Sequence, residues 1–90
     1  MVPASRLYFS LVKIGDETCR AVPDGHELTA TASVARVSGD RLLFFVPVAT
    51  ETEFYAGWEP EDYQRANARL HRTLRHRLRE FRLHAERDAD

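Results

Sequence analysis

The side chains of this 90-residue chain that are best suited to chemistry are arginines, which recur at helical spacing in its last third. A guanidinium group is permanently charged and binds a carboxylate or a phosphate through two parallel hydrogen bonds. If the segment is helical, these residues share one face, opposite an apolar stripe. The pattern therefore predicts a partner- or nucleic-acid-binding surface made of Arg65, Arg69, Arg72, His76, Arg79 and Leu83.

Metal and nucleophile chemistry have weaker support. His76, Glu80 and His84 recur every four residues, but on a helix they span two turns, about 11 Å, which is too far for one ion. Cys19 is the sole cysteine, so it can form neither an intrachain disulfide nor a cysteine zinc site. The sequence also lacks a glycine-rich phosphate loop and the common hydrolase and protease motifs. We therefore expect no catalytic residues, no metal and no cofactor, which favours a non-enzymatic protein.

A long helix is needed to position the arginines. Apolar residues in the last third recur at steps of three, four and seven, as in an amphipathic helix. Pro60 suits the first helical turn, and the acids that follow it favour the positive end of the helix dipole. We predict a helical segment over residues 58–87, with Ala66 at the edge of an apolar stripe made of Tyr63, Leu70, Leu74, Leu78, Phe81 and Ala85.

The preceding residues alternate between apolar and polar types, as strands do. We expect strands over 6–14, 18–22, 27–37 and 41–48, with 51–56 as a fifth strand or an extension. Turn residues separate them at Gly15-Asp16, Pro23–Gly25 and Ser38–Asp40. Small alanines in the third strand would let a helix approach closely. The prediction is one α+β domain, in which an antiparallel meander of four to five strands is followed by one long C-terminal helix packed on one sheet face.

Charge is divided unevenly between the two parts of this domain. Residues 1–62, with the sheet at 1–57, hold five basic and ten acidic residues, a net charge of −5. Residues 63–87 hold eight arginines and two acids, a net charge of +6, and an acidic tail follows at 88–90. Either the two parts complement each other or the helix meets an anion. Glu51 and Glu53 share one strand face, where we expect them to protect a sheet edge from aggregation.

Large apolar residues on the second sheet face suggest self-association, because a monomer of this size rarely leaves such a patch in water. We expect a homodimer, formed through that face or through an edge strand. The alternative is a strongly coiled sheet that wraps the helix and buries both sets. The possible interface residues are Leu43, Phe45, Phe54, Tyr55 and Trp58. The apolar run 7–12 is too short for a signal sequence or a membrane span, so we expect a cytoplasmic protein with no membrane partner.

Two segments resemble known families. Leu28 to Val48, about a quarter of the chain, resembles the strand pairs of hotdog-fold thioesterases, which implies an enzyme with a small pocket between helix and sheet. Those folds place a long helix before these strands, whereas residues 1–27 contain none. Thr52 to Leu83 is similar to the end of ribosome-hibernation factors, which also have an early helix that is missing here. Neither resemblance carries a catalytic or binding residue into this chain.

Three functional hypotheses follow. The first is a small non-enzymatic regulatory or adaptor protein that docks onto another protein as a homodimer. The second is nucleic-acid binding, to RNA or DNA, through the arginine face, although the net charge of −1 is low for such a protein. The third is a small hotdog-like thioesterase-type enzyme.

Overall fold

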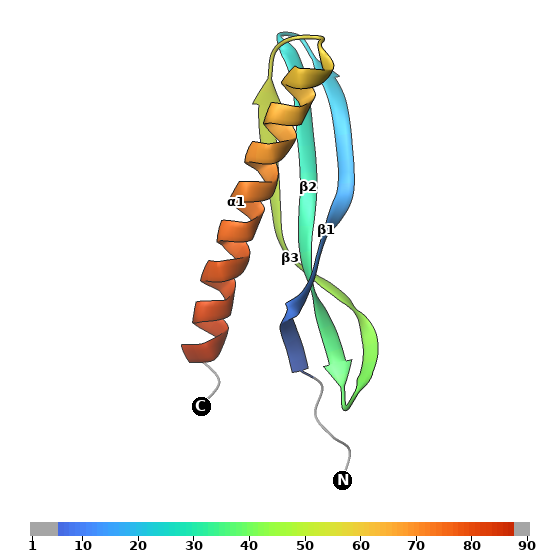
Figure 1. Cartoon of the computed structure of the whole chain (residues 1–90), viewed down its shortest axis with the longest axis vertical. Coiled ribbons are helices and arrows are strands. Elements are labelled where there is room, and N and C mark those ends of the chain that lie inside the picture. Colours follow the sequence, from blue (N-terminus) through green and yellow to red (C-terminus); the bar gives the residue numbers. More distant parts are fainter. Residues whose placement is uncertain (1–5, 88–90) are drawn as a thin grey trace.

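The computed structural model describes residues 6–87, which form one antiparallel sheet and one helix (Figure 1). The sheet has the strand order β1-β2-β3, and the helix lies along one of its faces. The elements are β1 (Arg6–Val22), β2 (Gly25–Ser38), β3 (Arg41–Tyr55) and α1 (Pro60–Arg87). The predicted α+β class and the order of sheet and C-terminal helix are therefore confirmed. The acidic tail at 88–90 lies outside the described residues.

The strands are longer than the sequence pattern suggested. The segments expected as the first and second strands are both parts of β1, because the chain does not reverse at Gly15-Asp16. Instead, the register with β2 shifts between Gly15 and Thr18, and Asp16 has a φ of 54°. These are the features of a bulge, which uses the same residue types as a turn. Residues 51–55 extend β3, so three long strands replace the four to five shorter ones that were expected.

The core forms where every fourth residue of α1 packs on alternate residues of β2. The two rows are Ala66, Leu70, Leu74 and Leu78 from the helix and Leu28, Ala30, Ala32 and Val34 from the strand, and none of them is more than 7% exposed. A row of every fourth residue is inclined to the helix axis. Ala66, predicted at the edge of the stripe, is therefore fully buried, whereas Phe81 is 36% exposed. The side chain of Ala85 lies outside the described residues.

The start of α1 is fixed by Asp62. The backbone N–H of Asp62 donates to the carbonyl of Glu59 at 3.0 Å, and the N–H of Glu59 donates to the Asp62 carboxylate at 3.2 Å. An acid at the third helical position that reaches back in this way accepts a hydrogen bond from the backbone N–H of the residue just before the helix, as in one half of a capping box. Gly57, with a φ of 111°, lies against the same carboxylate, where a Cβ would have no room.

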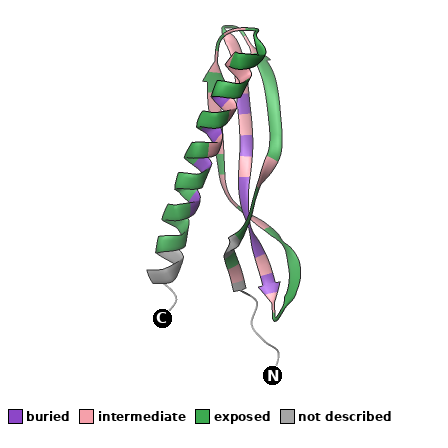
Figure 2. Ribbon diagram, in the orientation of Figure 1, coloured by how far each residue is buried: buried purple, intermediate pink, exposed green. Residues whose placement is uncertain are grey.

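The helix covers only part of the sheet. The molecule measures 56 × 24 × 19 Å and has a radius of gyration of 16.2 Å, against about 12 Å for a compact domain of this length. We call residues 6–11 of β1 together with the β2–β3 hairpin at 35–45 the distal end. There the strands twist away from α1 (Figure 1). Figure 2 shows buried residues along β2 and the inner side of α1, but mostly exposed ones along β1 and the tip of the hairpin.

Leu74 tests the assignment of the core. Leu74→Ala is expected to lower the free energy of unfolding by about 2–5 kcal/mol, because it opens a cavity in a fully buried row. Urea denaturation followed by circular dichroism measures the change. Gln64→Ala, at an exposed position of the same helix, is the matched control and should change it by less than about 0.5 kcal/mol. Equal losses in the two variants would mean that this row is not the core.

Candidate functional site

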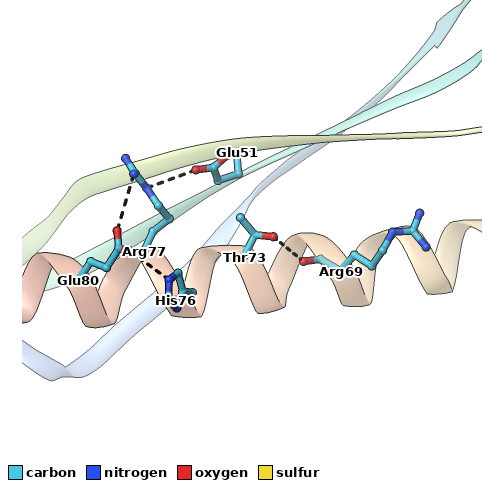
Figure 3. A network of polar contacts seen from close by, with 6 residues as sticks. All are labelled: Glu51, Arg69, Thr73, His76, Arg77 and Glu80. Carbon is cyan, nitrogen blue, oxygen red and sulfur yellow. Dashed lines mark hydrogen bonds and ion pairs between the residues drawn. The ribbon is translucent and has the colours of Figure 1, made fainter.

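The side of α1 that faces β3 is neutralised by carboxylates of the sheet. Arg69 Nε lies 2.6 Å from Glu53 Oε1, and Arg77 Nε lies 3.3 Å from Glu51 Oε1 (Figure 3 shows the second pair). The register explains the fit, because Glu51 and Glu53 lie opposite Ala30 and Leu28 on the face that the helix covers. The two acids therefore form contacts with the helix. The sequence had instead suggested that they protect a sheet edge from aggregation. In this region, the negative charge of the sheet complements the positive charge of the helix.

Contacts with carboxylates occupy three of the predicted binding residues. Arg65 pairs with Asp62 at 2.5 Å, Arg69 pairs with Glu53, and His76 Nε2 lies 3.1 Å from Glu80. Arg72 and Arg79 are exposed and, within residues 6–87, form no ion pair. Leu83 is 55% exposed. The predicted arginine face is thus not one uniform surface, because part of its charge is used to attach the helix to the sheet. The side chain of His84 lies outside the described residues.

A groove with a different character lies between α1 and β1. His71 Nε2 lies 3.0 Å from Glu17 Oε1 at the end of the groove nearer the start of α1. Farther toward the C-terminal end of α1, the groove has a cavity volume of about 200 Å³ and is lined by Val12, Arg75, Leu78, Arg79 and Arg82. Arg75 was not among the predicted binding residues. Its place in the groove follows from its position three residues before Leu78, on the side of the helix toward β1.

Aromatic rings gather where β3 passes into α1. The His26 ring stacks on Tyr55 with centroids 4.8 Å apart, Trp58 meets His26 edge-on at 4.7 Å, and Tyr63 meets Tyr55 edge-on at 6.4 Å. Tyr55, predicted as an interface residue, therefore points to the helix side and is half-buried. Trp58 and Phe54 remain 84% and 64% exposed. A cavity of about 230 Å³ adjoins them, lined in part by Phe54, Tyr55 and His26.

Tyr55 also has a polar partner in this cluster. Its hydroxyl lies 3.6 Å from the sulfur of Cys19 on β1, the edge strand on the far side of β2. The hydrogen bond with Cys19, together with desolvation of the phenol and the charges of Cys19, Tyr63 and Asp62, raises the pKa of Tyr55 to about 12. Tyr55 is consequently a neutral hydrogen-bonding group at physiological pH. It fixes the start of the helix against β1 and β2 and is not set up as an acid or a base.

The distal end exposes large apolar side chains on both of its faces. Residues Leu42, Leu43, Phe44 and Phe45 are 52%, 44%, 54% and 38% exposed, and Tyr8 and Leu11 are 39% and 51% exposed. Tyr8 and Phe45 flank the fully buried Ala35 on one face. Phe44 lies opposite Arg36 on the other face. Leu43 and Phe45, both predicted interface residues, thus belong to a patch that the helix does not cover.

The remainder of the far sheet face is polar, contrary to expectation. Thr29 and Thr52 are joined by a hydroxyl–hydroxyl hydrogen bond of 3.1 Å, and Thr31 and Thr50 by one of 3.0 Å. Val12 lies opposite the core residue Val34 and is therefore on the helix side. On the far sheet face, the large exposed apolar side chains therefore lie at the distal end and, at the opposite end, at Phe54. A sheet that wraps the helix and buries both sets of apolar residues is not what the chain forms.

Comparison of the chain with models of protein families, with curated proteins and with solved structures finds no match. Within residues 6–87, no helix is both long enough and apolar enough to cross a membrane. The functional inference therefore depends on the surfaces described above.

The ion pairs between helix and sheet are expected to contribute little to stability. The side chains of Arg77 and Glu51 are 54% and 30% exposed, so their coupling energy should be about 0.2–1 kcal/mol. A double-mutant cycle of Glu51→Gln and Arg77→Gln, measured by urea denaturation, isolates this energy. It should decrease in high salt. A coupling of zero at low salt would contradict the pairing.

The Cys19–Tyr55 contact can be tested by absorbance titration of tyrosinate. Cys19→Ala removes the hydrogen-bond partner, so the pKa of Tyr55 should fall from about 12 toward the ordinary value of about 10. At about pH 11, the variant should then contain more tyrosinate than the wild type. Tyr55→Phe is the control that assigns the late-titrating group. Identical titration curves for wild type and Cys19→Ala would show that the contact with Cys19 does not raise the pKa of Tyr55.

Proposed function

We propose that this protein is a small, non-enzymatic regulatory or adaptor protein that docks onto another protein as a homodimer, with the two copies joined at their distal ends. The observation that carries the proposal is the exposed apolar surface of the distal end. Four consecutive large side chains, Leu42 to Phe45, are each at least 38% exposed. Consecutive strand residues point to opposite faces, so neither face of the hairpin is covered within one copy.

The size of this surface suits a dimer. Whole aromatic side chains cover about 150–250 Å² each, so six large side chains exposed by roughly half leave about 500 Å² of apolar surface. A stable interface buries about 800 Å² per partner, of which about 65% is apolar in homodimers. The distal end thus supplies the apolar area of one such interface when the side chains of both of its faces take part. Its six members are Tyr8, Leu11, Leu42, Leu43, Phe44 and Phe45.

A second copy is the occupant best matched to this surface, because an apolar patch is self-complementary under a two-fold axis. The elongated shape supports the same proposal. A radius of gyration of 16.2 Å describes a chain whose distal strands have no second layer of their own. Two copies would provide that layer for each other, as two-layer domains require.

Dimerisation through the distal end would leave the opposite end of each protomer free. Trp58 and Phe54 lie there, on a molecule 56 Å long. Exposed aromatic residues are enriched at protein–protein interfaces. A symmetric dimer with a docking surface at each outer end is the arrangement of an adaptor. The exposed thiol of Cys19 suits a reducing compartment, so we propose a cytoplasmic location.

Nucleic-acid binding is the second candidate, and exposed Arg72 and Arg79 favour it. Against it, the ion pairs of Arg65, Arg69 and Arg77 reduce the charge that is available for phosphates. Binding to phosphates is expected to weaken steeply as salt increases. The absorbance ratio at 260 and 280 nm of the purified protein, at low and high salt, separates this candidate from protein docking.

An enzyme of the hotdog type has the least support. That hypothesis requires a deep cavity along the alanine strand. Ala30 and Ala32 are instead fully buried against Ala66, Leu70 and Leu74. The helix side chains thus occupy the space where such a pocket would lie.

Light scattering coupled to size-exclusion chromatography tests the dimer. The wild type should have about twice the chain mass of 10.4 kDa. Phe45→Glu should convert it to a monomer, because the dimer would have to bury an unpaired carboxylate. The matched control is Phe54→Glu, in the same strand but away from the distal end, which should remain dimeric.

A monomeric wild type at high micromolar concentration would contradict the proposed dimer. So would a variant Phe45→Glu that remains dimeric. Circular dichroism of each variant shows whether the fold is kept, and Phe44→Glu tests whether the other face of the hairpin also takes part in the dimer.

A further inference from the structure

The groove between α1 and β1 has an open strand edge along one side. Within residues 6–87, β1 pairs with β2 alone, so its outer edge carries backbone N–H and C=O groups without a neighbouring strand. The helix lies toward β3 and leaves β1 mostly exposed (Figures 1 and 2). Open edges of this kind accept an extended segment of another protein, whose main chain then supplies the hydrogen bonds.

Charge distinguishes this groove from the opposite side of the helix. On the β3 side, Arg69 and Arg77 each meet a sheet carboxylate. On the β1 side, the acid that faces the helix, Glu17, pairs with His71. Arg75 and Arg79 lie farther along the groove and form no ion pair within the part of the chain that the structure describes. The sheet thus complements the helix on one side and leaves it basic on the other.

The floor of the groove is apolar. Val12, 43% exposed, and Leu78, 7% exposed, line it between the guanidinium groups, and the cavity holds about 200 Å³. An occupant that matches this surface carries carboxylates for the arginines and small apolar side chains for the floor. In an extended chain, alternate residues point to opposite sides. The residues that face the groove must therefore themselves include both types, apolar ones for Val12 and Leu78 and acidic ones for Arg75 and Arg79.

We infer that this groove binds an acidic extended segment of a partner protein, which adds as a strand to the edge of β1 and meets Arg75 and Arg79 with its carboxylates. The inference rests on the proposed docking function and names the chemistry of the docked partner. The occupant is not the β1 edge of a second copy, because pairing of two β1 edges would bring two such basic rows together, and juxtaposed like charges oppose association.

The inference is tested with a short synthetic peptide that contains glutamates and valines, labelled with a fluorophore, whose anisotropy is followed during titration with the full-length protein. The wild type should bind it, and Arg75→Glu should weaken the affinity about tenfold or more. Arg72→Glu is the matched control. It makes the same charge change on the same helix, but at about 160° around the axis from the buried Leu74, and it should weaken binding by less than about threefold.

Equal losses for Arg72→Glu and Arg75→Glu would overturn the inference, because they would reflect the overall charge of the helix and no specific groove. Absence of peptide binding by the wild type would overturn it as well. Arg79→Glu provides a second variant if Arg75→Glu does not fold. A labelled single-stranded oligonucleotide of the same charge is titrated in parallel. If it binds more tightly than the peptide and loses affinity in Arg75→Glu, the groove is a nucleic-acid site and the peptide inference is wrong.

The dimer and the groove can fail separately. Each groove belongs to one chain, so monomeric Phe45→Glu should bind the peptide as the wild type does. A wild type that is dimeric but does not bind the peptide would contradict the proposed groove and support the proposed dimer. A wild type that binds the peptide but is monomeric would contradict the dimer and support the groove.

Discussion

The packing of one helical row on two alanines determines most of what this molecule presents to its surroundings. Ala30 and Ala32 have no side chain beyond Cβ, so the row from Ala66 to Leu78 lies close against β2. The row takes every fourth residue, which inclines the helix to the strands. As a result, α1 covers β2 and β3 and leaves β1 open, and its buried row ends at Leu78, because the next position in the row is Arg82. The open groove and the uncovered distal end both follow from this one contact.

Charge follows the same geometry. The inclination of the helix brings Arg69 and Arg77 over the strand that carries Glu53 and Glu51. Surface pairs of this kind add little stability, but they determine which side of the helix remains basic. The net charge of −1 for the whole chain therefore hides a neutral side, a basic groove and an apolar tip. The opposite net charges of residues 1–62 and 63–87 indicate that the sheet and the helix are complementary. They do not indicate which side of the helix meets the carboxylates of the sheet.

Sequence periodicity predicted much of the fold, because helices and alternating strands are local features. The helix at Pro60 to Arg87 and the buried alternation from Leu28 to Val34 were both predictable. The bulge at Gly15-Asp16 was not, since turns and bulges favour the same residues. The pairing of Arg69 with Glu53 was also missed, because it depends on the crossing angle of helix and sheet. The predicted interface residues differ in exposure for the same reason. Phe45 and Trp58 are exposed, whereas the Tyr55 ring contacts Tyr63 of the helix.

In the proposed dimer, a second copy completes the distal end. The most direct test is an isotope-filtered nuclear Overhauser experiment on an equal mixture of labelled and unlabelled protein, which detects only contacts between chains. We expect contacts between chains from the side chains of Leu42 to Phe45 and from Tyr8, and none from Phe54 or Trp58. Contacts confined to Phe54 and Trp58, or none at a concentration where light scattering reports a dimer, would contradict it.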